Sequence, residues 1–70
     1  MSMNPVNSST IDSIGYDQNS NKLTVKFKTG AIYEYLNVPH YVYDAVMSAD
    51  SVGKALNNEV KGIYDYSKIQ

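Results

Sequence analysis

Hydrophobic and polar residues alternate strictly over residues 22–28, and this is the clearest strand signal in the chain. Leu23, Val25 and Phe27 fall on one face of this strand, while lysines and a threonine fall on the other. A second alternating segment follows directly after Lys28-Thr29-Gly30. The pattern therefore predicts a β-hairpin whose register depends on the length of the connecting loop.

Two loop lengths are compatible with the turn residues of this hairpin. A two-residue turn would direct Glu34 into the core. A three-residue loop, with Gly30 in the left-handed conformation, instead pairs Val25 with Tyr33 and puts Tyr35 on the same face. Because this second register keeps Glu34 outside, it is the one we predict.

The same register leaves apolar residues on the outer face of the hairpin. Ile32 and Leu36 are expected there, beside Lys26 and Glu34. A half-apolar outer face is typical of a surface that contacts a partner. These four residues form the predicted interface, either for self-association or for another protein.

A first strand is predicted before the hairpin. Residues 10–16 are rich in β-branched and aromatic side chains. Ile11 and Ile14 share a face only if a bulge intervenes, and Gly15 is a plausible position for that bulge. Residues 17–21 then form a polar loop.

Two short helices are predicted after the hairpin. Val38-Pro39 ends the sheet, and residues 40–49 carry apolar side chains at the spacing of one helical face. Ser51 is a suitable N-cap for a second helix, although Asp50 fits equally well. The apolar stripe of this second helix comprises Val52, Leu56, Val60 and Ile63. Periodicity leaves open whether residues 64–70 form a helix end, a strand or a free tail.

These elements predict an α+β domain with a three-stranded antiparallel β-meander followed by two short helices packed on one face. A chain of 70 residues has room for one core. We assign residues 1–8 to a flexible N-terminal tail and residues 9–70 to a single domain. The start of the chain lacks the basic and apolar runs of a signal peptide, and cysteine is absent, so we expect a cytoplasmic protein.

Composition limits the chemistry that this domain can perform. The net charge of −1 excludes a uniformly basic surface, so any anion site must be local. All cationic side chains are lysines, which cannot clamp a phosphate as arginine does. They either form one patch or are scattered as solubilising charges, and we favour the second arrangement. A lone His40 without a positioned nucleophile forms no triad, so we expect neither an enzyme nor a cofactor.

Two groups of residues are candidates for ligand binding. Ser51, Gly53 and Lys54 combine a helix start with a hydroxyl and an ammonium group, although plain capping also explains Ser51 and is favoured. Tyr33 and Tyr35 have the aromatic character of a base-stacking surface, although the preferred register favours a structural role. The predicted ligand-binding residues are Tyr33, Tyr35, Ser51, Gly53, Lys54, Asn57 and Lys61.

The order of several short motifs gives the chain a family resemblance. These motifs are Ile14-Gly15-Tyr16-Asp17, the alternation of Leu23, Val25 and Phe27, Gly30, Tyr33-Glu34-Tyr35, Val38-Pro39, and Ser51-x-Gly53 with Asn57 and Tyr64. Over residues 8–66 the chain resembles the KTSC domain, which is found at the C-terminus of some lysyl-tRNA synthetases and as small bacterial and phage proteins. Ala55 departs from the family pattern, in which an aromatic residue is common at this position.

The resemblance implies a suggested role in RNA binding. We therefore expect a non-catalytic binding module for RNA or a nucleotide-like anion, with no membrane partner. The alternative is a phage-type protein-interaction module, or a homo-oligomer that sequesters a nucleotide, acting in the host cytoplasm against a host component.

Overall fold

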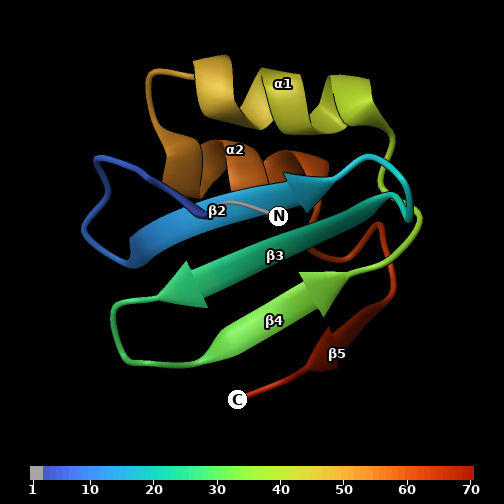
Figure 1. The fold of residues 1–70 in the computed structure, drawn as a ribbon. Helices are drawn as coiled ribbons and strands as arrows, with labels where there is room; N and C mark the ends of the chain where they lie inside the picture. Colours follow the sequence, from blue (N-terminus) through green and yellow to red (C-terminus); the bar gives the residue numbers. More distant parts are fainter. Residues whose placement is uncertain (1–2) are drawn as a thin grey trace.

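Residues 3–70 fold into one antiparallel sheet with two helices on a single face, as the computed structural model shows (Figure 1). The strands are β1 (Met3–Pro5), β2 (Ile11–Asp17), β3 (Lys22–Phe27), β4 (Ile32–Tyr35) and β5 (Tyr66–Lys68), and the helices are α1 (His40–Ser48) and α2 (Val52–Glu59). Neighbouring strands follow chain order, β1-β2-β3-β4-β5, and the two helices separate β4 from β5 in sequence.

The predicted α+β class is confirmed, but the sheet in the described part of the chain has five strands rather than three. The additional strands β1 and β5 lie at the two edges and have three exposed residues each, which is too short to show an alternating pattern. Strand β1 lies inside segment 1–8, where we predicted a flexible tail; residues 1 and 2 of that segment lie outside the described residues. Of the alternatives for residues 64–70, the structure shows the strand, because β5 pairs with β4.

The predicted register of the central hairpin is confirmed. Val25 pairs with Tyr33 and Leu23 pairs with Tyr35. The three-residue loop is closed by the Gly30 amide, which donates to the Phe27 carbonyl over 2.9 Å, and Gly30 has the positive φ of 96° that this loop requires. The core-facing side of β4 therefore carries tyrosines, as expected.

Strand β2 contains the predicted bulge, but the position that we gave for it is wrong. The register with β3 shifts between Ile11 and Ser13, so the bulge lies at Asp12 rather than at Gly15. The extra residue brings Ile11 and Ile14 to the same face, where both are fully buried. The residues of β2 alone are compatible with several bulge positions, and only the pairing with β3 determines which one is used.

The core lies between the helices and the sheet. Its members share near-complete burial; they are Ile11, Ile14, Leu23, Val25, Tyr35, Val38, Val42, Val46, Val52, Leu56 and Val60. Val52, Leu56 and the C-cap residue Val60 are buried, as predicted for three of the four positions in the apolar stripe. The fourth is wrong: α2 ends at Glu59, and Ile63 is 62% exposed after a turn in which Gly62 has a φ of 79°.

An aromatic cluster joins β2 to the start of α1. The Tyr16 ring stacks on the Tyr43 ring with centroids 5.1 Å apart and meets His40 edge-on at 5.6 Å. The Tyr16 hydroxyl donates to the Val38 carbonyl just before α1. Burial raises the pKa of this hydroxyl, and the Asp17 and Asp44 carboxylates raise it further. We call Tyr16, His40 and Tyr43 the closed cluster.

Candidate functional site

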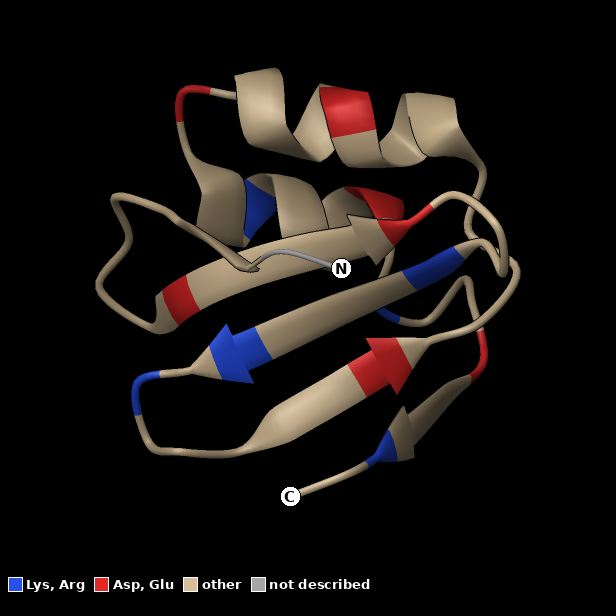
Figure 2. Ribbon diagram, in the orientation of Figure 1, with Lys and Arg blue, Asp and Glu red and all other residues tan. Residues whose placement is uncertain are grey.

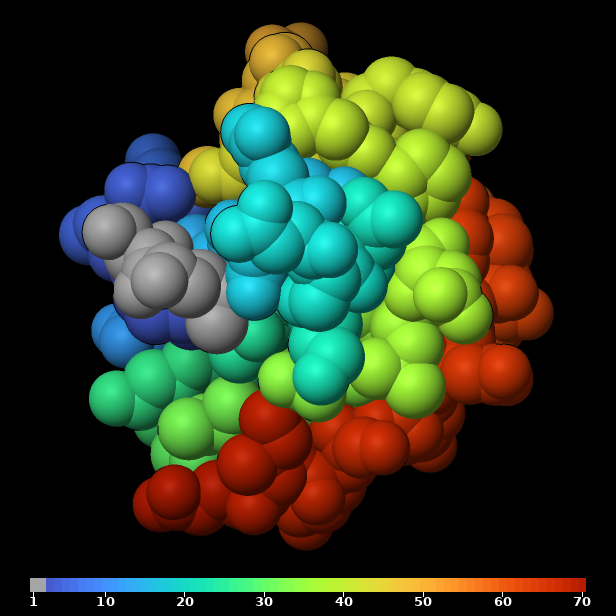
Figure 3. Space-filling view, turned by 45° about the vertical axis from the view of Figure 1, so that its right-hand side comes forward, coloured from blue at the N-terminus to red at the C-terminus, as the bar shows by residue number. Residues whose placement is uncertain are grey.

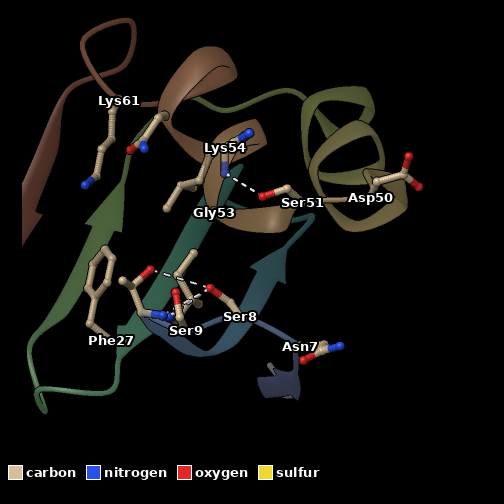
Figure 4. A pocket seen from close by; sticks show the side chains of 13 residues that line it. Asn7, Ser8, Ser9, Phe27, Asp50, Ser51, Gly53, Lys54 and Lys61 are labelled. Carbon is tan, nitrogen blue, oxygen red and sulfur yellow. Dashed lines mark hydrogen bonds between the residues drawn. The ribbon is translucent and has the colours of Figure 1, made fainter.

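The largest of three cavities among the described residues lies between the N-terminal half of α2 and the segment that leads into β2. Its volume is about 590 Å³. It is lined by Asn7, Ser8, Ser9, Thr10, Ile11, Phe27, Asp50, Ser51, Gly53, Lys54, Leu56, Asn57 and Lys61. Figure 4 shows Gly53 and Ser51 on one side of this cavity, Ser8 and Ser9 below them, and Phe27 with Lys61 across from them. We call this the hydroxyl cavity.

The start of α2 forms one wall of the hydroxyl cavity. Ser51 adopts an extended conformation, and its side-chain oxygen accepts the Lys54 amide over 3.3 Å. The predicted N-cap is therefore confirmed, and Asp50 does not take this role. The Ser51 carbonyl accepts the Ala55 amide over 3.0 Å, which begins the helical ladder. Capping fixes the direction in which the first turn of α2 faces the cavity.

The segment before β2 forms the opposite wall. The Ser8 side-chain oxygen accepts the amides of Thr10 and Ile11, both over 3.2 Å, so this segment is held in a tight turn. A Cβ atom added to Gly53 would lie 3.6 Å from the Ser8 hydroxyl oxygen and 3.8 Å from that of Thr10. Glycine at this position therefore leaves space between helix and turn that a single methyl group would occupy.

Lys61 and Phe27 separate the hydroxyl cavity from a second one. The Lys61 ammonium lies 5.3 Å from the centroid of the Phe27 ring, within the range of a cation–π contact. The second cavity has a volume of about 440 Å³. It is lined by Ser9, Thr10, Phe27, Lys28, Thr29, Ala31, Tyr33 and Lys61.

A third cavity of about 300 Å³ lies at the β4–β5 edge and has aromatic walls. It is lined by Tyr33, Tyr35, Lys61, Gly62 and Tyr66. The rings of Tyr33 and Tyr66 are parallel, with centroids 5.3 Å apart. Tyr35 is 2% exposed, and burial, followed by the proximity of Tyr33 and Tyr66, raises the pKa of its hydroxyl. We call Tyr33 and Tyr66 the open cluster.

The structure brings the predicted ligand-binding residues together around Lys61. Five of the seven, Ser51, Gly53, Lys54, Asn57 and Lys61, line the hydroxyl cavity. The other two line the remaining cavities: Tyr33 borders the second and third, and Tyr35 the third alone. Their proximity is a finding, whereas their role in binding stays a prediction. The structural role favoured for the tyrosines holds for buried Tyr35, while Tyr33 is only partly buried.

Sequence reasoning missed several side chains that line these cavities. Ser8, Ser9 and Thr10 come from the segment where the predicted tail meets the domain, and their run of hydroxyl groups was the available signal. Phe27 was assigned to the core by alternation, yet it also borders two cavities. Tyr66 comes from the segment whose structure was left open.

Lys26, Ile32 and Glu34, three of the four predicted interface residues, occupy the outer face of the sheet. Lys26 pairs with Ile32, and Glu34 pairs with Thr24. The Glu34 carboxylate lies 3.5 Å from the Lys22 ammonium. Leu36 follows β4, and its amide donates to the Asp65 carbonyl over 2.8 Å. Their role as an interface stays a prediction.

The lysines are distributed over several elements, shown in blue in Figure 2, and only some of them line the cavities. Lys28, Lys54 and Lys61 line the cavities. Lys22 and Lys26 lie on β3 and Lys68 on β5, outside all three cavities. Asp50 is the one acidic residue lining any of the three, and Figure 4 shows its carboxylate directed away from Phe27 and Lys61. The cavities are thus locally cationic on a nearly neutral chain.

Comparison with protein families gives a match to the KTSC domain over residues 7–66. The chain belongs to the KTSC domain family. The predicted resemblance is therefore confirmed, with nearly the same bounds. A solved KTSC domain protein from Yersinia pestis is 38% identical and superposes with a TM-score of 0.94 over 99% of this chain and 97% of that one.

KTSC relatives include both small proteins and longer ligases. A protein from Tsukamurella paurometabola is 42% identical over 59 residues, which cover 84% of this chain and 88% of that protein. A lysine–tRNA ligase from Nostoc punctiforme is 33% identical over 61 residues. That match covers 87% of this chain but 11% of the ligase, so the KTSC chain corresponds to a small part of the longer protein.

Two further findings describe residues 3–70 of this KTSC domain. None of the helices in that range is long and apolar enough to cross a membrane. The same range holds no group of three or more histidine, cysteine or acidic side chains placed to bind a metal ion. His40, the single histidine, has its Nδ1 atom 2.9 Å from a carboxylate oxygen of Asp44 on the surface of α1.

Proposed function

We propose that this KTSC domain is a non-catalytic binding module for RNA or a nucleotide-like anion. The observation that carries the proposal is the hydroxyl cavity, where ammonium groups and hydroxyl groups surround the start of a capped helix. Helix starts favour anions because their amides point outward and carry partial positive charge. Lysines supply the counter-charge that phosphate requires.

The arrangement of charge supports a local anion site rather than general adhesion to nucleic acid. The whole chain carries a net charge of −1. Lys54 and Lys61 nevertheless line one cavity together, and Lys28 borders the next. A few phosphate contacts of this kind predict moderate affinity that decreases as salt rises.

The state of the hydroxyl groups supports binding rather than catalysis. The oxygens of Ser8 and Ser51 each accept backbone amides, which holds them as structural acceptors. Among the described residues, no histidine lines the hydroxyl cavity, and the carboxylate of Asp50, its one acidic residue, is directed away from Phe27 and Lys61 (Figure 4). The occurrence of a similar domain within lysine–tRNA ligases, whose name specifies an RNA, is also consistent with an RNA ligand.

Neutralising the cavity lysines tests this proposal. Lys54→Ala and Lys61→Ala should each weaken binding of a short fluorescent RNA, and each should lower the slope of log affinity against log salt by about 1. Fluorescence anisotropy across a salt series measures both quantities. Lys26→Ala, which removes an exposed lysine from the outer sheet face, is the matched control and should bind normally. Unchanged affinity in both cavity variants would refute the site.

A further inference from the structure

The three cavities form a series in which neighbouring cavities share lining residues. Lys61 lines all three. Phe27 borders both the first and the second cavity, and Tyr33 borders both the second and the third. With volumes of about 590, 440 and 300 Å³, each is of the size that holds a small ligand or part of one, so the series is longer than one such ligand requires.

The chemistry of the walls changes along this series. Four hydroxyl side chains and Lys54 are among the residues that line the first cavity, whereas three tyrosines line the third. Sites for single-stranded nucleic acid combine these two characters, because cationic groups follow the backbone while aromatic rings stack on the bases. Lys61, shared by all three cavities, lies where these two characters meet.

The open cluster has the geometry of a stacking platform. Tyr66 is 58% exposed and lies parallel to Tyr33, so part of its ring surface is free for a further aromatic group. Gly62 lines the same cavity without a side chain, and its φ of 79° favours glycine there. Figure 3 shows the C-terminal segment, in orange and red, along the border of the molecule beside the light green of β4, and all three residues of β5 are exposed.

We propose, building on the anion-binding function above, that the ligand is a single-stranded oligonucleotide rather than a mononucleotide. A base stacks on Tyr66 at the β4–β5 edge, a phosphate lies near Lys61, and the strand continues into the hydroxyl cavity beside Lys54. RNA and DNA single strands share this chemistry. A double helix does not, because its bases are stacked on one another and unavailable to Tyr66.

A length series tests this proposal on the full chain. Uridine monophosphate and oligouridylates of two to about six nucleotides compete against a fluorescent hexanucleotide, with oligothymidylates as the DNA arm. We expect affinity to rise at least about tenfold from the mononucleotide to the tetranucleotide, since successive nucleotides add both phosphate contacts and base stacking. A duplex of the same length should bind more weakly than the single strand.

Replacing Tyr66 tests whether a base stacks at the third cavity. Tyr66→Leu should weaken oligonucleotide binding at least about fivefold, because stacking on one aromatic ring contributes about 1–3 kcal/mol. It should leave the affinity for inorganic phosphate unchanged, because phosphate has no base to stack on Tyr66. Tyr41→Leu is the matched control, because Tyr41 is 72% exposed on α1 and lines none of the three cavities.

The outcomes distinguish this proposal from the function on which it rests. Equal affinity for the mononucleotide and the tetranucleotide, or an unaffected Tyr66→Leu variant, overturns the oligonucleotide proposal while leaving anion binding in place. Equal binding of the duplex also overturns it. If no member of the series binds, both proposals fail. Tighter binding of oligouridylate than of oligothymidylate would support the single-strand proposal and identify RNA as the preferred ligand.

Discussion

The closed and open clusters each contain a tyrosine from the same row of paired residues in the sheet, but the two tyrosines have different surroundings. Tyr16, Leu23, Tyr35 and Tyr66 form one row of paired residues across β2, β3, β4 and β5. The closed cluster lies at the β2 end of this row, where α1 covers Tyr16 with two aromatic rings. The open cluster lies at the β5 end, where Tyr66 borders a cavity instead.

Hydrogen bonding separates the two clusters more clearly than ring stacking does. Both contain a stacked tyrosine pair, with centroids 5.1 Å apart in one and 5.3 Å in the other. The Tyr16 hydroxyl donates to the Val38 carbonyl, and the Tyr43 hydroxyl accepts from the Asn4 amide group. The closed cluster thus joins β1, β2 and α1. A stacked pair alone does not distinguish an aromatic group that holds the fold together from one that is available to a ligand.

Replacing Tyr16 in the closed cluster and Tyr66 in the open cluster should give the largest difference in the free energy of unfolding. Tyr16→Leu removes the stack on Tyr43 and leaves the Val38 carbonyl without its donor, so we expect a loss of about 2–3 kcal/mol in the free energy of unfolding. Tyr66→Leu should cost less than about 1 kcal/mol, because the ring is 58% exposed. Urea unfolding followed by circular dichroism measures both values. Similar losses in the two variants would contradict the division into closed and open clusters.

Alkaline pH should lower the free energy of unfolding by a smaller amount, through Tyr16 of the closed cluster and through the buried Tyr35. The pKa of Tyr16 is raised chiefly by burial, and that of Tyr35 is raised for the same leading reason. Above about pH 10 the unfolded chain releases these protons while the folded chain retains them, so the stability that they contribute is complete below that pH and lost as pH rises through the folded-state values. Urea unfolding between about pH 8 and 11 should show this decrease.

The Tyr16→Phe variant provides the control for this pH dependence. It lacks the ionisable hydroxyl and should lose less stability between neutral and alkaline pH than the wild-type chain. It should also start from a lower stability at neutral pH, because the bond to the Val38 carbonyl is absent. An identical pH profile for the variant and the wild type would show that Tyr16 does not contribute to the alkaline effect.

Local chemistry explains which parts of this structure the sequence could predict. Gly30 supplies a positive φ at one position of a short loop, and the alternation on either side then determines the register. Ser51 caps α2 through an amide three residues away. These features depend on neighbours within a few residues, so the pattern of residue types was sufficient for them.

The features that the sequence did not predict depend on distant partners. Strand β1 exists because its three residues pair with β2, and β5 because it pairs with β4 after two intervening helices. The bond from Tyr16 to Val38 spans 22 residues, so the sequence around Tyr16 does not reveal that this ring belongs to a closed cluster. The predicted site residues came together for a related reason: Lys61 follows α2 and reaches Phe27 across the domain.

Filling the hydroxyl cavity gives the smallest expected change in stability and the clearest separation of stability from binding. Gly53→Ala adds a Cβ atom at 3.6 Å from the Ser8 oxygen, an ordinary contact distance that needs no rearrangement. Alanine also favours the helix, so the free energy of unfolding should rise by about 0.5 kcal/mol.

The same methyl group narrows the space between α2 and the Ser8–Thr10 turn, so RNA binding in the anisotropy assay should weaken although the domain is more stable. A substitution that damaged the fold would lower both quantities together. Asn58→Ala, at an exposed position of α2 that lines none of the three cavities, is the control and should leave binding unchanged. Full RNA affinity in Gly53→Ala would place the ligand outside the hydroxyl cavity, and the open cluster would then have to bind it without help from the start of α2.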